Sequence, residues 1–419
     1  MDEQNNYVTV KPRANMATIF RSLGLGIIVG AADDDPSGIA TYSQVGAQNG
    51  YGLLWLLVIA TPMLQVVQVT CAKIGIVTRQ GLAILVHNRY GLKVALFITS
   101  ITALANLLTI AADIAAISAG LELVAHLRWQ YFAIPITVIL WYFLVYQDFN
   151  IIRKVMLLLS LSLIGYIMAG VMVHPHLPEV LRGVFIPHIE FNMGYMTAVV
   201  GLLGTTLTPY MFFFQATEEV EERKKVKHLN RVTIETTLGM IMSNVVSFFI
   251  ILSTAATVHV HHGTVDTVEQ AAQALAPFAG KSATYLFAAG IIGSGMLAVP
   301  VLAASTASMI GETVGWRVGM NRTYARARGF YNAITVVLIL GLLITLVGIP
   351  PMKALFWSQV FNGIVSPILL VFIFLIGADE KLMGKHIISL GQKCWGWFTI
   401  TIMASAVVLM IWSWVSGGR

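Results

Sequence analysis

Charge is the first thing this sequence has little of. Only 11% of its 419 residues are Asp, Glu, Lys or Arg, whereas an ordinary soluble domain has about 25%. Hydrophobic residues make up 57% of the chain, and its mean hydropathy is +0.77. So few polar side chains could not cover the surface of a soluble fold of this length. The composition therefore predicts an integral membrane protein, with lipid as the solvent around most of the chain.

Cysteine is also scarce, and several catalytic motifs are missing. Cys71 and Cys394 are the only two cysteines, too few for a disulfide framework or a cysteine metal cage. The sequence has no HExxH motif, no phosphate-binding loop and no recognisable nucleophile–base pair, so we expect neither an enzyme nor a bound cofactor. The first fifteen residues are polar and lack the apolar core of a signal peptide, so the first apolar span should be retained.

Apolar runs of about 20 residues, the length that crosses a hydrocarbon core, recur along the whole chain. They predict an all-α polytopic membrane protein with no soluble domain. The eleven predicted spans are 19–48, 52–72, 94–125, 131–147, 151–173, 193–217, 232–258, 282–310, 329–348, 353–377 and 396–415. A short extra helix is expected over Val268–Leu275, within a polar loop.

The basic residues are unevenly distributed between the loops. If the N-terminus lies in the cytoplasm and the spans alternate, 21 of the 26 lysines and arginines fall on the cytoplasmic side. This is the positive-inside rule, so the net charge of +6 reflects an orientation with the C-terminus outside and implies no nucleic-acid partner. Residues 1–18 are expected to form a cytoplasmic tail. No obligatory protein partner is evident, and short loops without targeting signals favour a prokaryotic inner membrane.

Two of the spans carry a proline near their middle. The first reads GLGIIVGAADDDPSGIATYSQVGAQ and the sixth reads GLLGTTLTPYMFFFQATEE. Pro36 and Pro209 each remove a backbone donor and disfavour helix in the residue before them. We therefore expect both helices to unwind near the membrane midplane, where irregular backbone survives only if it lines a cavity or is buried in protein.

The two interrupted spans are the first members of two sets of five. This is the pattern of transporters built from inverted repeats, whose substrate binds between the breaks. It predicts a secondary transporter of LeuT-type architecture with 5+5 helices. The first repeat would cover 19–173, the second would cover 193–377, and an eleventh helix over 396–415 would lie outside both. Together they would form one transmembrane domain over 19–419.

Three consecutive carboxylates, Asp33, Asp34 and Asp35, stand at the first break. An ionised carboxylate inside a membrane costs about 3 kcal/mol on insertion scales, so such residues usually have a function. Asp35 directly precedes the proline, and its carboxylate together with freed backbone carbonyls would make a cation site. Successive helical residues point about 100° apart, so Asp34 is expected to line the aqueous approach and Asp33 to face a neighbouring helix. Alternatively, the first span ends at Ala32 and all three lie in an external loop, which leaves the apolar stretch Ile39–Val45 unexplained.

These stretches resemble the Nramp family of divalent-metal transporters. The segment GLGIIVGAADDDPSGIATYSQVGAQNGYGLLW is similar to the family's first-helix region, whose hallmark is Asp-Pro-Gly-Asn followed by Ala-Thr. The similarity continues through AKIGIVTRQGLA, AADIAAISAG, LLGTTLTPYMFF and FWSQVFNGIVSPILL, and so covers nearly the whole chain. It implies the fold described above and the transport of divalent cations.

Where the family binds its ion, this sequence departs from the motif. By the resemblance, Asp35 holds the place of the ligating Asp, Gly38 that of the Asn, Thr205 that of an Ala carbonyl ligand, Thr208 that of the Met, and Tyr210 that of the following His. A site without thioether sulfur, offering carboxylate, hydroxyl and carbonyl oxygens, suits a hard cation. Loss of the Asn side chain should also widen the cavity and so favour partly hydrated Mg²⁺. The pattern resembles the Nramp-related magnesium transporter branch and predicts transport of Mg²⁺, with Mn²⁺ as a second substrate.

The resemblance also implies a reduced proton pathway. The third-span positions that are acidic in the family read Asn106, Asp113 and Ala116, and the position of a sixth-span His reads Gln215. Alternating access is expected from the transporter architecture. Because Asn, Ala and Gln cannot titrate, we expect proton coupling to be weak or absent. Asp113 is a residual proton-path position, and we expect it to act mainly as a buried hydrogen-bond acceptor.

Polar residues elsewhere have two interpretations each. Gln359 and Asn362, on the tenth span, could approach the ion as a Gln does in the family, or could hydrogen-bond to a neighbouring helix as polar residues in spans commonly do; neither interpretation is favoured. His259, His261 and His262 have metal-ligand spacing, but they lie near the outer end of the seventh span, which favours a solvated loop.

Other functions are compatible with the same residues. The chain could be a proton-coupled Mn²⁺ or Fe²⁺ transporter of the ordinary family type. It could carry an organic or monovalent cation on the same fold, with Asp35 paired to an amine or to Na⁺. A non-transporting membrane receptor is a third possibility, but the lack of any sizeable soluble domain argues against it.

Overall fold

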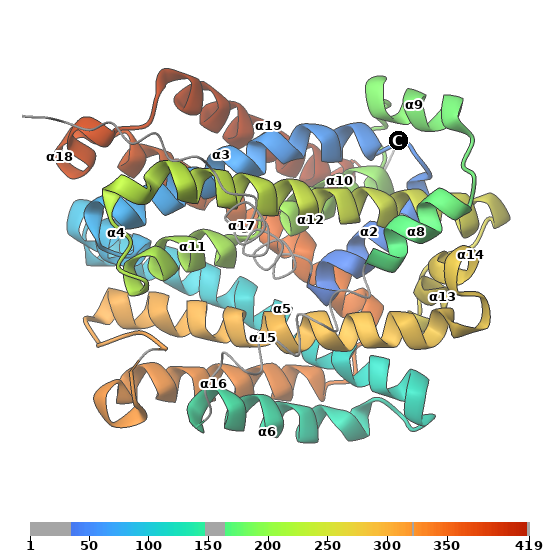
Figure 1. Cartoon of the computed structure of the whole chain (residues 1–419), viewed down its shortest axis with the longest axis horizontal. Helices are drawn as coiled ribbons and strands as arrows, with labels where there is room; N and C mark the ends of the chain where they lie inside the picture. The colour runs from blue at the N-terminus through green and yellow to red at the C-terminus, as the bar shows by residue number, and fades with distance from the viewer. Residues whose placement is uncertain (1–34, 147–163, 321, 417–419) are drawn as a thin grey trace, which may run out of the picture.

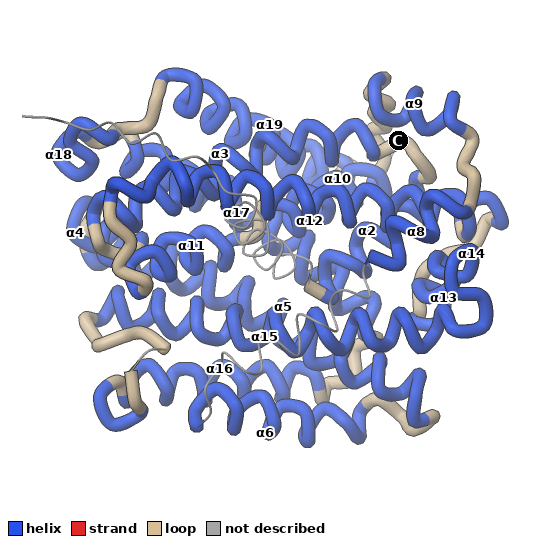
Figure 2. The backbone as a smooth tube through the Cα atoms, in the orientation of Figure 1, coloured by secondary structure: helices blue, strands red, loops and turns tan. Residues whose placement is uncertain are grey.

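The computed structural model describes residues 35–146, 164–320 and 322–416, and all regular structure within these ranges is helical (Figure 1, Figure 2). The longer helices are α2 (Pro36–Asn49), α3 (Leu54–Thr78), α5 (Leu92–Ala125), α6 (Gln130–Tyr146), α8 (Ile164–Met172), α10 (Met193–Thr206), α11 (Pro209–Glu221), α12 (Leu229–Thr257), α15 (Ala283–Val314), α16 (Arg328–Thr345), α17 (Pro351–Gly377) and α19 (Leu390–Val415). Short helices in the connections are α4 (Leu82–Tyr90), α9 (Leu177–Phe185), α13 (Val268–Ala272), α14 (Ala276–Ala279) and α18 (Glu380–Met383).

Eight helical segments of the described chain are long and apolar enough to cross a membrane, with α10 and α11 counted as one segment. The other three predicted spans correspond to the shorter helices α2, α6 and α8. Two of these, α2 and α8, directly follow residues 1–34 and 147–163. The first half of the predicted first span and the beginning of the fifth therefore lie outside the described residues.

The long helices run side by side, and the short connecting helices gather at the two ends of the bundle (Figure 1). One end carries α4 and α18, at the left of the picture, and we call it the α4 face. The opposite end carries α9, α13 and α14, and we call it the α9 face. The short helix expected over Val268–Leu275 is confirmed, since α13 and a 3₁₀ turn over Gln273–Leu275 form it at the α9 face.

The sixth predicted span is interrupted where its proline indicated. Helix α10 ends at Thr206, and α11 begins at Pro209, the first helical position, where a missing N–H removes no helical bond. Between them Leu207 (φ −115°, ψ 62°) and Thr208 (φ −76°, ψ 132°) are not helical. Pro36 occupies the same position at the start of α2. The predicted break at Pro209 is therefore confirmed, and a helix begins at Pro36 as expected.

Close contacts between helices position this interrupted region. A Cβ atom added at Gly204 of α10 would overlap with the carbonyl oxygen of Gln359 on α17, so only glycine allows the two backbones to approach so closely. Helices α5 and α15 are joined by hydrogen bonds between Thr99 and Thr313 (2.8 Å) and from Asn106 to the hydroxyl of Thr306 (2.8 Å). These interhelical contacts fix the helices around the break.

Candidate cation site at the helix breaks

Asp35 is the N-cap of α2 and lies inside the protein. Its backbone is extended (φ −73°, ψ 166°), and its Oδ1 accepts a hydrogen bond of 2.6 Å from the backbone N–H of Gly38. The residue is 1% exposed, and its Oδ2 has no hydrogen-bond partner within the described residues. The stretch Ile39–Val45 is the buried middle of α2, so the alternative of an external loop is wrong for Asp35. Asp33 and Asp34 lie outside the described residues.

Gly38 faces Asp35 and the side chain of Thr205. A Cβ atom at Gly38 would lie 3.0 Å from Thr205 Oγ1, 3.3 Å from Asp35 Oδ1 and 3.5 Å from the ring of Tyr42. The structure thus brings Asp35, Gly38 and Thr205 together, as the resemblance implied. It also corrects one expectation: the space beside Gly38 is not widened, because the Thr205 hydroxyl and the Tyr42 ring fill it.

Tyr42 was not identified as a site residue from the sequence. One helical turn after Gly38, its hydroxyl lies 3.3 Å from Thr206 Oγ1, which joins α2 to α10 beside the break. Tyr42 is 4% exposed. The signal that could have identified it is its spacing of four residues from Gly38, which places both on one face of the helix.

Thr208 is the N-cap of α11 and is buried beside the break. It is 2% exposed, its side chain makes no capping bond, and its Oγ1 has no hydrogen-bond partner in the described part of the chain. The neighbouring carbonyl of Leu207 is occupied, because it accepts a 2.5 Å hydrogen bond from the hydroxyl of Ser366 on α17. The Thr208 hydroxyl is therefore an oxygen donor available to a cation at the break. The Leu207 carbonyl is instead used to hydrogen-bond the break to α17.

Tyr210 contributes packing at this point. Its side chain belongs to an apolar cluster formed with residues of α5 and α15, among them Ile114 and Leu302. Its carbonyl accepts a 3.0 Å hydrogen bond from Ser305 on α15. These contacts hold the start of α11 against α15.

Asp113 contacts the first turn of α2 directly. Ser37, between the proline and Gly38, donates a 2.7 Å hydrogen bond to Asp113 Oδ1 across the interface between α2 and α5. Both residues are fully buried. Asp113 is thus a buried hydrogen-bond acceptor, as expected, and Ser37 is a site-supporting residue that the sequence did not single out.

Replacing Asp113 with alanine is expected to lower uptake of the transported ion about threefold and to destabilise the protein by about 1–3 kcal/mol, because Ser37 loses its acceptor. Asp113→Asn keeps an oxygen acceptor and should behave like wild type in both respects. Thermal unfolding in detergent and uptake into liposomes would measure the two effects. If asparagine is as damaging as alanine, the charge of Asp113 matters and its role is not that of a hydrogen-bond acceptor alone.

Gln359 and Asn362 are both fully buried on α17. Asn362 Nδ2 donates to Thr109 Oγ1 on α5 at 3.2 Å and to Gln359 Oε1 at 3.0 Å. Asn362 therefore makes the interhelical hydrogen bond that was one of its two interpretations. The backbone of Gln359, rather than its side chain, lies close to the break. Its carbonyl oxygen packs against Gly204 of α10.

Two buried carboxylates nearer the α4 face were also missed. Glu219 is 2% exposed and pairs with Lys224 at 3.1 Å, and Glu312 is 5% exposed and accepts a 3.3 Å hydrogen bond from Thr217. Glu312 is the one acidic residue of α15, whereas Glu219 stands beside Glu218 and Glu221 at the end of α11. Both lie just beyond the predicted spans 193–217 and 282–310, so the hydropathy pattern did not mark them as acidic residues within a span.

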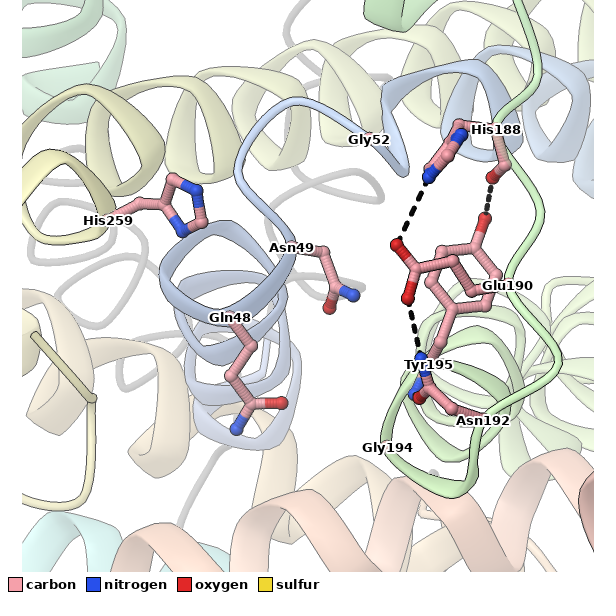
Figure 3. Close-up of a pocket in the computed structure, with 9 residues that line it drawn as sticks. All are labelled: Gln48, Asn49, Gly52, His188, Glu190, Asn192, Gly194, Tyr195 and His259. Carbon is pink, nitrogen blue, oxygen red and sulfur yellow. Dashed lines mark hydrogen bonds and ion pairs between the residues drawn. The ribbon is translucent and has the colours of Figure 1, made fainter. Parts of the chain in front are cut away.

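A polar pocket of about 400 Å³ opens at the α9 face, beside the end of α2 (Figure 3). On one wall His188 lies 3.1 Å from Glu190 Oε1, and Asn192 Nδ2 donates to the other oxygen of Glu190 at 2.5 Å. On the opposite wall His259 Nδ1 contacts the carbonyl of Ala47 at 2.7 Å. His261 and His262 are exposed, which confirms the expected solvated loop. Among the described residues no three His, Cys, Asp or Glu side chains converge closely enough to hold a metal.

A bundle of long apolar helices, with the sixth predicted span interrupted at Pro209, is consistent with a LeuT-type membrane transporter, and comparison with solved structures shows this fold. A mutant of the manganese transporter of Eremococcus coleocola is similar with a TM-score of 0.78 and 18% identity, covering 96% of this chain and 88% of that one. A structure of Mhp1, a nucleobase-cation-symport-1 family transporter, is similar with a TM-score of 0.62 and 14% identity, covering 94% and 92% of the two chains.

The sequence identifies the family within this class. The family model described as natural resistance-associated macrophage protein-like matches residues 26–413. The chain therefore belongs to the Nramp family, whose members are transporters and not enzymes. The divalent metal cation transporter MntH of Deinococcus radiodurans is 24% identical over 430 residues, covering 98% of this chain and 93% of that protein.

Proposed function

We propose that this protein carries divalent cations across a bilayer by alternating access, with Mg²⁺ as its main substrate and Mn²⁺ as its second. The relatives named above are a divalent metal cation transporter and a manganese transporter, which supports the class of substrate. The observation that carries the choice of Mg²⁺ is the donor set at the breaks. The Asp35 carboxylate and the Thr205 hydroxyl lie beside each other around Gly38, and we add the Thr208 hydroxyl at the start of α11 as a third donor. All three are oxygen donors, and all three residues are buried.

The hardness of these donor atoms determines which cation they favour. Mg²⁺ prefers carboxylate, hydroxyl and carbonyl oxygens, whereas thioether sulfur favours softer transition metals. The methionine nearest to Thr208 in the sequence is Met211. Its side chain is packed in the apolar cluster with residues of α5 and α15, so it is not one of the proposed donors. Mn²⁺ also accepts oxygen ligands, so it would be carried as well. Because Thr205 and Tyr42 fill the space beside Gly38, the preference for Mg²⁺ rests on the donor atoms rather than on a wide cavity.

Proton coupling would be weak or absent. Asn106 donates a hydrogen bond to Thr306, and Gln215 donates one to Glu219 at 2.9 Å, so both act as fixed hydrogen-bond donors. Ala116 has no polar group. With Asp113 engaged by Ser37, no chain of titratable groups stands at the third- and sixth-span positions, and the ion would move down its own gradient.

The orientation belongs to the same proposal. We place the N-terminus and the α4 face in the cytoplasm and the C-terminus and the α9 face outside, because 21 of 26 basic residues then lie inside. The membrane would be the inner membrane of a prokaryote. The inverted repeats would cover 19–173 and 193–377, with the interrupted helix α10–α11 matching the one that contains Pro36.

Uptake into liposomes tests the substrate and the coupling together. Purified protein is reconstituted with an internal Mg²⁺-sensitive dye, and influx of Mg²⁺, Mn²⁺ and Ca²⁺ is recorded with and without a pH gradient. We expect saturable Mg²⁺ influx that does not respond to the pH gradient, a smaller Mn²⁺ influx, and none in protein-free liposomes.

Two other outcomes would overturn parts of this proposal. Proton-driven Mn²⁺ influx without Mg²⁺ influx would identify an ordinary proton-coupled family member and contradict the argument from ligand hardness. Absence of any metal influx, with competition or uptake of organic amines or Na⁺, would identify a transporter of organic or monovalent cations on the same fold.

A further inference from the structure

An apolar cavity of about 470 Å³ lies between α5, α16, α17 and α19, away from the helix breaks. Its lining is almost entirely aliphatic and aromatic, and Lys353 is its one charged residue. The lining residues are Leu108, Ala111, Ala112, Ala115, Ile344, Thr345, Ile349, Lys353, Ala354, Trp357, Ser358, Val360, Phe361, Ile364 and Trp414.

The cavity is as deep as one leaflet of a bilayer. Along α17 it runs from Lys353, in the first turn of that helix, to Ile364. The rise from Lys353 to Ile364 is about 16 Å at about 1.5 Å per residue, and half of a hydrocarbon core is about 15 Å. The entrance, at the α9 face, carries Trp357 and Trp414, whose rings lie 5.9 Å apart, and tryptophan is enriched at the membrane–water interface.

An apolar cavity of this size does not hold water, because water needs polar partners. Left empty, it would lose the packing contacts of its walls. In a bilayer, the apolar group available to fill this cavity is a lipid acyl chain. At the entrance, the Lys353 ammonium and the positive N-terminal end of α17 both favour a negatively charged group.

We propose that this cavity binds an anionic phospholipid of the leaflet at the α9 face, with one acyl chain inside and the phosphate beside Lys353. Ala112 and Ser358 line the cavity, and each directly adjoins a buried polar residue near the breaks, Asp113 and Gln359. A bound acyl chain would therefore pack against the faces of α5 and α17 that carry Ala112 and Ser358, next in sequence to polar residues near the candidate cation site. The binding does not depend on which ion the protein carries.

Native mass spectrometry of detergent-purified protein with added phosphatidylglycerol tests the site. We expect wild type to retain one phosphatidylglycerol in preference to phosphatidylcholine. Lys353→Ala should weaken this affinity about fivefold, since one basic residue near the surface contributes about that factor. Ala112→Leu should place a side chain in the cavity and abolish retention. Lys281→Ala, which removes another exposed lysine of the α9 face, should bind as wild type does.

Thermal unfolding separates loss of the site from misfolding. Phosphatidylglycerol should raise the unfolding temperature of wild type and of Lys281→Ala, and not that of Ala112→Leu. Without lipid, Ala112→Leu should be at least as stable as wild type, because it fills a cavity. The proposal is overturned if Lys353→Ala and Ala112→Leu retain the lipid as wild type does, or if Lys281→Ala loses it equally. Equal retention of phosphatidylcholine would overturn the role of Lys353.

Discussion

Replacing Asp35 with asparagine is expected to reduce Mg²⁺ uptake about a hundredfold while the protein unfolds at nearly the wild-type temperature. Asn and Asp are equally good N-caps, so the bond from the Gly38 N–H to the side chain at position 35 should persist. What disappears is the negative charge, and a charged ligand contributes about 3 kcal/mol, or about a hundredfold. Uptake into dye-loaded liposomes and thermal unfolding in detergent measure the two properties.

Asp35→Ala is the matched control for the capping role. It removes both the charge and the cap, so uptake should be lost as in Asp35→Asn, with an added destabilisation of about 1 kcal/mol. Wild-type uptake by Asp35→Asn would show that Asp35 is only a helix cap. The cation site would then have to be sought elsewhere in the protein.

Gly38→Asn is expected to lower uptake about tenfold, although it restores the residue that the family has at this position. Its Cβ would lie 3.0 Å from Thr205 Oγ1 and 3.3 Å from Asp35 Oδ1, and overpacking of a buried site costs about 1–3 kcal/mol. Adding Thr205→Ala removes the hydroxyl that occupies this space. The double variant should therefore recover most of the uptake, and its Mn²⁺ influx should rise relative to Mg²⁺ influx because an amide oxygen is added beside Asp35.

The single variant Thr205→Ala completes a double-mutant cycle. It leaves a small void and removes one oxygen donor, so it should reduce uptake by itself. Two residues in contact are expected to show a coupling free energy of about 0.5–3 kcal/mol. Additive effects of Gly38→Asn and Thr205→Ala would contradict the contact on which this prediction rests. The two departures from the family motif would then be independent substitutions.

The broken helix at Pro209 could be predicted because its cause is local. A proline removes a backbone donor wherever it stands, and the structure leaves Leu207 and Thr208 non-helical beside it. Apolar runs likewise marked most of the spans, because a bilayer imposes a minimum length on each. The grouping of Asp35, Gly38 and Thr205 followed from the family resemblance rather than from either of these patterns.

The sequence by itself determined that this is a polytopic membrane protein, that the sixth span breaks at Pro209, and that a helix begins at Pro36 with the Asp35 carboxylate beside it. These features depend on hydropathy, on proline geometry and on residues adjacent in the chain. Only the tertiary structure decided that Thr205 and Tyr42 fill the space beside Gly38, that Ser37 binds Asp113, and that Ser366 occupies the Leu207 carbonyl. Apart from Tyr42, which lies one turn from Gly38 on α2, each of these contacts joins segments that are far apart in the chain. Their geometry depends on how closely the helices pack and on their rotation about their axes, which no local pattern of residues specifies.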